Sequence, residues 1–328
     1  MNGIIGGEII AAKQHNNLEG KSQFLQTGRW ERGWGFLWKS KAEYISESLV
    51  EKLLMLSAVV SIMALLLISV FIFSRGVPLI AKVGLGDFLF SLEWRPTQGV
   101  FGIGAMFIGS LVLTLASLVW AVPLGLLTAV FMAEIAPPPL IRIMTCMVNL
   151  LAGIPSVVYG FFGLVIIVPL IRNYLGGTGM SVLAGAVILG IMILPTIINI
   201  SQDAIQAVPR EYKESSLALG ASHYQTIGRL ILPAASSGII TAVVLAMGRA
   251  IGETMAVVMV TGNAPIIPDN LLAPLRTMTS NIVLEMGYAA GDHQAALFAT
   301  GAILFIFILL LNLVLNSIRR AGKRYAGN

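Results

Sequence analysis

Apolar runs of about 20 residues recur along this chain, and they constrain its fold more than any other feature. A run of that length crosses the roughly 30 Å hydrocarbon core of a bilayer as one α-helix. Only 11% of the 328 residues are charged, whereas a soluble domain carries about 25%. A water-soluble surface is therefore excluded, and the sequence predicts an all-α polytopic protein embedded in a lipid bilayer.

The apolar pattern predicts six spans within one transmembrane domain over residues 50–320. The spans cover residues 50–74, 103–133, 141–171, 180–201, 234–262 and 294–317. Pro123, Pro155 and Pro195 lie inside spans, where each frees a backbone carbonyl that neighbouring helices must satisfy. We therefore expect a packed bundle of bent helices.

Lysines and arginines are distributed unequally between the two sides of these spans. Of the 21, fifteen lie before the first span, in the loops after the second and fourth spans, and in the C-terminal tail. Five lie in the opposite loops, and the last, Arg249, lies within a span. Because basic loops stay in the cytoplasm, we expect both termini there, as an N-terminal segment over 1–49 and a basic tail over 321–328.

The N-terminal segment carries Trp30, Trp34 and Trp38 beside several basic residues. On a helix, residues four apart share one face. The spacing therefore predicts a helix that lies in the cytoplasmic headgroup layer before the first span. The alternative is a poorly ordered tail.

The composition also excludes several classes of function. The net charge of +5 is explained by basic cytoplasmic loops, so we expect no nucleic-acid partner. Neither HExxH nor G-x-S-x-G is present, which argues against an enzyme. Gly20-Lys21-Ser22 resembles the end of a P-loop, but His15 replaces the first glycine of that motif. We expect no catalytic residue, metal or cofactor on this chain.

The loop between the fourth and fifth spans, residues 203–233, is long and well patterned. Pro209 suits the first turn of a helix, and Gly220 can end that helix with a positive φ. Ser222 and Gln225 then have the spacing of a capping box that opens a second helix. This helix is expected to run from His223 to about residue 232, before the fifth span begins. The loop thus predicts two short helices joined by a glycine turn.

Glu214-Ser-Ser-Leu-Ala-Leu-Gly220, followed by Leu230-Ile-Leu-Pro233, resembles the EAA motif of ABC importer permeases. Serines stand where that family has two alanines, and Leu230 replaces an isoleucine. In the family this loop carries a coupling helix that docks on a separate ATPase. The resemblance implies that role for Glu214, Ser215, Ser216, Gly220, Leu232 and Pro233. The alternative is an amphipathic loop lying on lipid.

Further segments resemble one subfamily, the phosphate-specific Pst permeases. They are residues 151–163, Trp94-Arg-Pro with Phe101-Gly102, and residues 249–256 with Gly262-Asn263, the last being similar to the PstC type. The resemblance covers roughly residues 50–320 and implies a type I ABC importer permease fold. Phosphate import by alternating access would then follow, in a bacterial-type plasma (inner) membrane. A permease for another oxyanion, molybdate or sulfate, is the nearest alternative.

The same resemblance implies several partners. They are a PstA-like permease that completes a heterodimer, a PstB-like ATPase dimer that uses ATP-Mg, and a phosphate-binding protein on the outer side. An ion-coupled secondary transporter is an alternative from another class. That class needs no ATPase and gives no reason for a glycine-turn cytoplasmic loop.

Arg249 and Glu253 are the two charges of the fifth span. About 15 residues at 1.5 Å each place Arg249 past the bilayer midplane, so we expect it to face the bundle interior. Arg before Glu is the less favourable order for an i,i+4 pair on a helix. Donors of the guanidinium should then remain for an oxyanion, which its fork can bind at two oxygens. This predicts a substrate pathway at both residues; the alternative is a pair that only fixes packing.

Three other features carry smaller predictions. Gly248 and Gly252 form a small-xxx-small face that lets another helix approach closely. Residues 263–293 fit an outer surface helix, a re-entrant piece or an ordinary loop. Glu134 and Asp203 lie at the cytoplasmic ends of spans, where we interpret them as interfacial caps.

Overall fold

The computed structural model describes residues 41–325, and the chain forms two units, residues 1–68 and 69–328. The helix predicted around Trp30, Trp34 and Trp38 lies outside the described residues. Helix α2 (Lys41–Val83) runs from the first unit into the second and contains the first span.

Six helices among the described residues are long and apolar enough to cross a membrane, which confirms the predicted number. They are Leu49–Val83, Gly104–Ile135, Ser156–Leu175, Val182–Gln206, His223–Gly252 and Asp292–Val314. The first, second, fourth and sixth coincide with the predicted spans apart from their ends. The third and fifth differ, because each predicted run contains a break in the helix.

The third predicted span, 141–171, is two separate pieces. Helix α5 (Pro138–Gly153) ends before Pro155, and the spanning helix that follows consists of α6 (Ser156–Phe162), the π-helix η3 (Gly163–Ile167) and α7 (Val168–Leu175). Ile154 is extended, with ψ 128°, because the ring of a following proline disfavours helical geometry. Pro155 therefore breaks the run, whereas Pro123 and Pro195 lie inside continuous helices.

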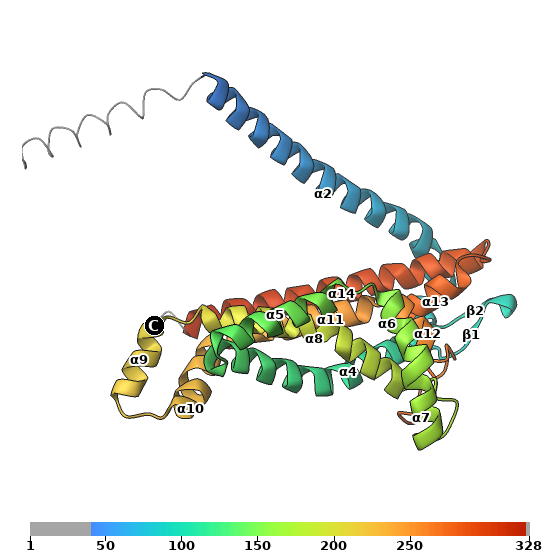
Figure 1. The fold of residues 1–328 in the computed structure, drawn as a ribbon. Coiled ribbons are helices and arrows are strands. Elements are labelled where there is room, and N and C mark those ends of the chain that lie inside the picture. The colour runs from blue at the N-terminus through green and yellow to red at the C-terminus, as the bar shows by residue number, and fades with distance from the viewer. Residues whose placement is uncertain (1–40, 326–328) are drawn as a thin grey trace, which may run out of the picture. The chain divides into compact units, whose positions relative to one another are not determined.

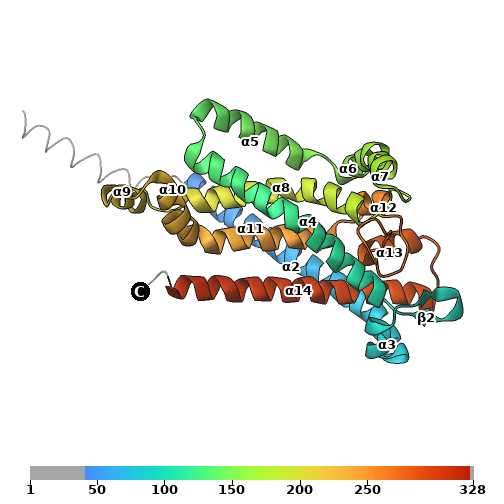
Figure 2. The same cartoon turned by 90° about the horizontal axis from the view of Figure 1, so that it is seen from below.

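The second unit is built around a bundle of long helices. Helices α4 (Gly104–Val130), α8 (Val182–Gln206), α11 (Leu232–Gly252) and α14 (Asp292–Tyr325) lie side by side (Figures 1 and 2). α4 and α8 share the main hydrophobic core. They approach so closely that a Cβ at Gly190 would lie 2.1 Å from the Trp120 ring. The indole Nε1 of Trp120 donates to the carbonyl of Ala186 at 3.2 Å.

The two ends of this bundle carry different short helices and strands. One end carries α9 (Arg210–Ala218), α10 (His223–Thr226) and the π-helices η2 (Phe131–Ile135) and η4 (Ile227–Ile231). The opposite end, here the hairpin end, carries α3 (Leu85–Phe90), the strands β1 (Trp94–Arg95) and β2 (Val100–Phe101), α12 (Met255–Val260) and α13 (Met278–Glu285). The strands pair antiparallel around the 3-10 turn η1 (Pro96–Gln98).

The segment 263–293 folds into the protein at the hairpin end. The first four residues of α13 are buried, and the amide of Met278 donates to the hydroxyl of Ser110 in α4 at 3.0 Å. Non-helical backbone at membrane depth is tolerated where protein surrounds it. The start of α13 therefore packs into the protein at this end, rather than lying free on its surface.

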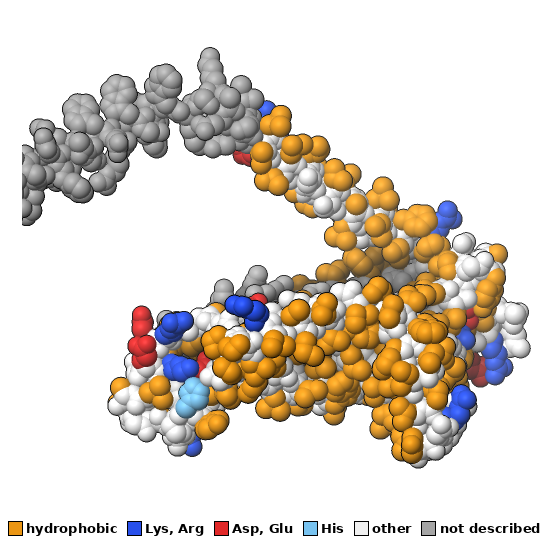
Figure 3. Space-filling view, in the orientation of Figure 1, with side chains coloured by type: hydrophobic (Ala, Val, Ile, Leu, Met, Phe, Trp, Pro, Cys, Tyr) orange, Lys and Arg blue, Asp and Glu red, His pale blue; other side chains and the backbone are white. Residues whose placement is uncertain are grey.

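The surface of the second unit separates apolar from charged side chains. Large apolar side chains cover the sides of its helices, whereas charged side chains gather at the two ends (Figure 3). This is the distribution expected for a bundle whose sides contact lipid and whose ends contact water.

Candidate functional site

Helices α9 and α10 form the helix, glycine turn and helix that the sequence predicts. Gly220 has φ 86°, a conformation that residues with a side chain rarely adopt. Ser222 accepts from the Gln225 amide, and the Gln225 side chain accepts from the Ser222 amide, which confirms the capping box. Pro209 precedes the first turn of α9 rather than lying in it, since its ψ of 135° is extended.

The second helix does not stop before the fifth span. α10, η4 and α11 form one continuous helix from His223 to Gly252. The predicted second helix therefore leads into the fifth span, but it does not end near Leu232. Pro233 lies in the first turn of α11. Pro233 has no backbone N–H to donate. It lies where the i+5 hydrogen bonds of the π-helix η4 give way to the i+4 hydrogen bonds of α11.

The turn between α9 and α10 presents an exposed surface. Glu214, Ser215 and Gly220 are exposed, and Leu219 is 89% exposed at the tip. Ser216 is half-buried because its hydroxyl bonds that of Thr226 at 2.9 Å, which ties α9 to α10. Tyr212, Leu217 and Tyr224 add exposed apolar area around the turn. Apolar side chains at a charged, water-facing end mark a surface that a partner covers.

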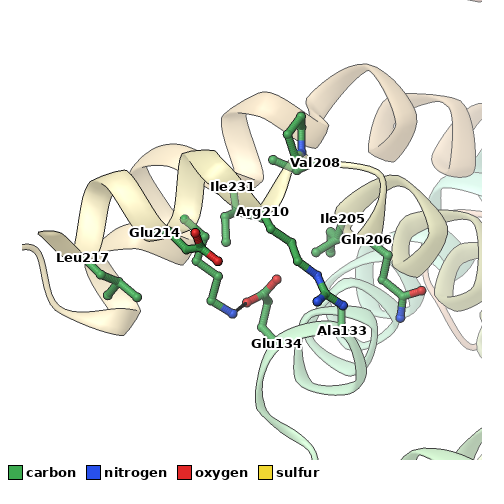
Figure 4. A pocket seen from close by; sticks show the side chains of 11 residues that line it. Ala133, Glu134, Ile205, Gln206, Val208, Arg210, Glu214, Leu217 and Ile231 are labelled. Carbon is green, nitrogen blue, oxygen red and sulfur yellow. Dashed lines mark hydrogen bonds and ion pairs between the residues drawn. The ribbon is translucent and has the colours of Figure 1, made fainter. Parts of the chain in front are cut away.

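A pocket of about 650 Å³ lies beneath α9, between it and the ends of α4 and α8. Figure 4 shows Arg210 and Glu134 directed into this space from opposite walls. Glu134, in η2, pairs with Lys213 of α9 at 2.5 Å between Oε2 and Nζ. Glu134 is therefore half of an ion pair, rather than the interfacial cap that the sequence suggested.

Arg249 lies in the last turn of α11, and its side chain is exposed on the surface of this chain. The expectation that it faces the interior of this chain's own bundle is wrong. Among the residues that the structure describes, it makes no ion pair or hydrogen bond.

Glu253 is not on the same helix turn as Arg249. α11 ends at Gly252, and Glu253 is extended, with ψ 135°. Its carboxylate accepts from the amide of Ala256 at 3.3 Å, at the start of α12, and its carbonyl accepts from the hydroxyl of Thr279 at 3.0 Å. The predicted helical i,i+4 geometry is therefore wrong: Glu253 satisfies backbone at the break between two helices, and Arg249 keeps its donors.

Gly248 and Gly252 lie one turn apart on a face of α11 that neighbours the one carrying Arg249. A Cβ at either position would meet nothing within 4 Å. No helix within the described part of the second unit packs against these glycines, so the close approach that their spacing predicts remains a prediction. Arg249 and the glycine face together form the second candidate site.

A third cluster, around Glu285, escaped the sequence analysis. This buried carboxylate accepts from Trp94 Nε1 at 2.8 Å, from Arg276 Nη1 at 2.6 Å, and lies 2.8 Å from His293 Nε2. Arg276 also donates to the carbonyl of Asn263 at 2.8 Å. The cluster ties β1, the segment 263–293 and α14 together. A lone acid in the apolar stretch 277–290 was the available signal.

Comparison with known proteins reveals clear relatives. The family model of binding-protein-dependent transport system inner membrane components matches residues 121–322. The probable ABC transporter permease protein YqgH of Bacillus subtilis is 41% identical over 265 residues, which are 77% of this chain and 86% of the relative. The phosphate transport system permease protein PstC of Mesorhizobium japonicum is 37% identical over 246 residues, which are 69% of this chain and 75% of the relative.

Solved structures share the fold. A bacterial ABC transporter involved in the import of the acidic polysaccharide alginate contains a chain that aligns with a TM-score of 0.58 at 15% identity. The alignment covers 85% of this chain and 99% of the other. At this identity the similarity supports the architecture of the helices and not the cargo.

Proposed function

Because this chain belongs to the binding-protein-dependent transport system inner membrane component family, and within it to the PstC-type permeases, we propose that it is the membrane-spanning subunit of an ATP-driven importer of inorganic phosphate. Relatives that are 30–37% identical to it over the aligned residues are named as phosphate transport permeases. The chain itself is a transport subunit, and ATP-Mg is hydrolysed by its partner.

The observation that carries the mechanism is the exposed helix–glycine turn–helix at residues 210–252. α9 buries no side chain within this chain, and the tip around Leu219 projects away from the bundle. We assign this surface, with Glu214, Ser215, Ser216 and Gly220, to docking of a PstB-like ATPase dimer. Leu232 and Pro233 join the turn to α11, so a push on α9 reaches the fifth span along one continuous helix.

The second site belongs to the substrate pathway. Arg249 presents a free guanidinium at membrane depth, and such a group binds tetrahedral oxyanions through two parallel hydrogen bonds. Its neighbours Gly248 and Gly252 leave room for a PstA-like permease, whose close approach encloses the arginine between two subunits. Glu253 holds the helix break that ends α11 next to this charge.

The orientation follows from the basic loops. With α9 in the cytoplasm, the hairpin end faces outward and receives a phosphate-binding protein. Both termini then lie in the cytoplasm of a bacterial-type plasma (inner) membrane. Alternating access moves phosphate from that protein past Arg249 to the α9 end.

Reconstitution tests the cargo. The complete complex is reconstituted in vesicles with the binding protein outside and the ATPase inside. It is expected to take up phosphate only when ATP is present inside the vesicles. Sulfate and molybdate at equal concentration serve as controls for a different oxyanion. If either is transported in place of phosphate, the permease function stands and the cargo assignment fails.

The coupling role is tested by Gly220→Pro. Proline cannot adopt the φ of 86° seen at this position, so the turn between α9 and α10 must change. The ATPase is expected to be lost when the complex is purified through this chain. Full retention of the ATPase by the variant would exclude docking on this turn.

A further inference from the structure

The ion pair between Glu134 and Lys213 joins two parts of the chain that are 79 residues apart. Glu134 lies in η2, the last turn of the second span, and Lys213 lies in the middle of α9. The carboxylate is only 10% exposed and the lysine side chain 33% exposed. An ion pair that is partly withdrawn from water is screened less than one on an open surface.

α9 has few other attachments to the bundle. It buries none of its residues, and a pocket of about 650 Å³ separates it from the ends of α4 and α8. Among the described residues, the side-chain hydrogen bonds and ion pairs that join α9 to other elements are the Ser216–Thr226 hydrogen bond on one side and the Lys213–Glu134 pair on the other. The pair therefore bridges a space that apolar packing does not fill (Figure 4).

Glu134 also lies close to α10. Its backbone carbonyl lies 3.3 Å from Nε2 of His223, the first residue of that helix. The charged groups that line the pocket with this pair are Arg210 and Glu214, and neither of them forms an ion pair within the described residues. One residue of the second span thus contacts both arms of the helix–turn–helix.

The second span can pass a movement of its cytoplasmic end to the helix packed against it. α4 is half buried and shares the main hydrophobic core with α8. A displacement of η2 therefore shifts a close-packed helix pair as a rigid element, because packed interiors deform little. The chain connection from α10 to α11, in contrast, reaches only the fifth span.

We propose that Glu134 is a positioning residue that links α9 directly to the second span, so that the movement of the ATPase reaches this span as well as the fourth and fifth spans, to which the chain itself joins α9. The inference rests on the proposed function, since it presumes that an ATPase moves α9. Breaking the pair leaves α9 attached through α8 and α10 and leaves the docking surface intact. The ATPase then still binds and turns over, while a smaller share of its cycles moves substrate.

The test measures phosphate taken up per ATP hydrolysed by the reconstituted complete complex, for Glu134→Gln, Lys213→Gln and the double variant. Each single variant is expected to lower this ratio by about 2- to 30-fold, the range over which mutations change coupling between sites. The double variant should lose no more than either single one. The exchanged pair, Glu134→Lys with Lys213→Glu, should recover part of the ratio. Lys82→Gln, which breaks the exposed pair with Asp292 at the opposite end, is the matched control.

Several outcomes would overturn the link. One is an unchanged ratio of phosphate taken up to ATP hydrolysed in both single variants. Another is a double variant whose fold-decrease in this ratio equals the product of the two single fold-decreases. Loss of the ATPase from both single variants on purification would show that the pair builds the docking surface instead. A wild-type complex that takes up no phosphate with ATP would contradict the proposed function itself, independently of this pair.

Discussion

Arg249 places a permanent charge on the exposed surface of the last turn of α11. An arginine at the centre of a spanning helix costs about 2.5–3.5 kcal/mol on insertion scales, which is an upper limit for this position. Glu253 does not offset that cost by pairing within one helix, because it caps the start of α12. The guanidinium is therefore stabilised by what lies outside this chain, which in our proposal is the partner permease and the passing anion.

Replacing this arginine tests its role. Arg249→Gln is expected to lower ATP-dependent phosphate uptake by about 10- to 150-fold, since a hydrogen bond to a charged group contributes about 1.5–3 kcal/mol. Uptake by Arg249→Lys should lie between that of the wild type and that of Arg249→Gln, because an ammonium keeps the positive charge but lacks the paired donors of the guanidinium. Uptake is measured over a range of phosphate concentrations on complexes shown to contain all subunits. Unchanged uptake by Arg249→Gln would remove the residue from the pathway.

Glu285 makes a different prediction, about stability. Glu285→Ala leaves the partly buried Arg276, whose side chain is 16% exposed, without its counter-charge. Breaking a fully buried pair costs about 3–5 kcal/mol, which is the upper limit for this one. We expect a lower midpoint of thermal unfolding in detergent, with a smaller loss for Glu285→Gln. The exposed Glu93–Arg95 pair is the control, because such pairs contribute about 0–1 kcal/mol. Equal midpoints for Glu285→Ala and Glu93→Ala would contradict the buried cluster.

Individual residues differed in how far the sequence could predict them. Gly220 and the Ser222–Gln225 cap were predictable because their signals are local, within four residues along the chain. The Glu285 cluster was not, since Trp94 lies 191 residues away from it. A lone acid in an apolar stretch signals a buried site, but it does not identify partners that only the tertiary fold brings together.

At the scale of elements, hydropathy predicted six spans and missed two breaks. An average over a window of about 19 residues does not register one or two extended residues within it. Pro155 offered a local signal for the first break, although Pro123 and Pro195 lie in unbroken helices. The break after Gly252 is held by the Glu253 carboxylate and by Thr279 from another segment, so the fifth span could not be divided from its own sequence.

The glycine face of α11 carries a prediction about helix contacts. Gly248→Leu should leave the folding of the second unit unchanged, because none of that unit's described residues lies within 4 Å of a Cβ there. It should prevent a PstA-like subunit from co-purifying, since leucine holds the helices apart. Gly190→Leu is the contrast, because Trp120 already fills the space beside that glycine. That variant should lower the thermal midpoint of the isolated chain. Retention of the partner by Gly248→Leu would place the interface elsewhere.

For the whole molecule, the two ends of the bundle should face opposite compartments. Cys146 is the single cysteine, so Cys146→Ser provides a background free of thiols. In it, Thr97→Cys at the hairpin tip should react with a membrane-impermeant maleimide on intact cells. Pro137→Cys, in the exposed loop before α5, should react only after the membrane is permeabilised.

The reversed labelling pattern would contradict the orientation derived from basic loops and the assignment of α9 to the cytoplasm with it. Labelling of both positions on intact cells would indicate a mixed topology. Neither result would alter the fold, because the bundle and its two ends are defined by packing alone.

The open glycine face beside Arg249 has a consequence for how the complex is made. No helix within the described part of the second unit competes for that face, so the subunit can complete its own fold before its partner arrives. Until then the arginine borders lipid, which makes the solitary subunit the less stable species in the membrane. Synthesis of the two permeases in matched amounts would therefore govern how long each copy survives, and a surplus of either one is expected to be removed by membrane proteases.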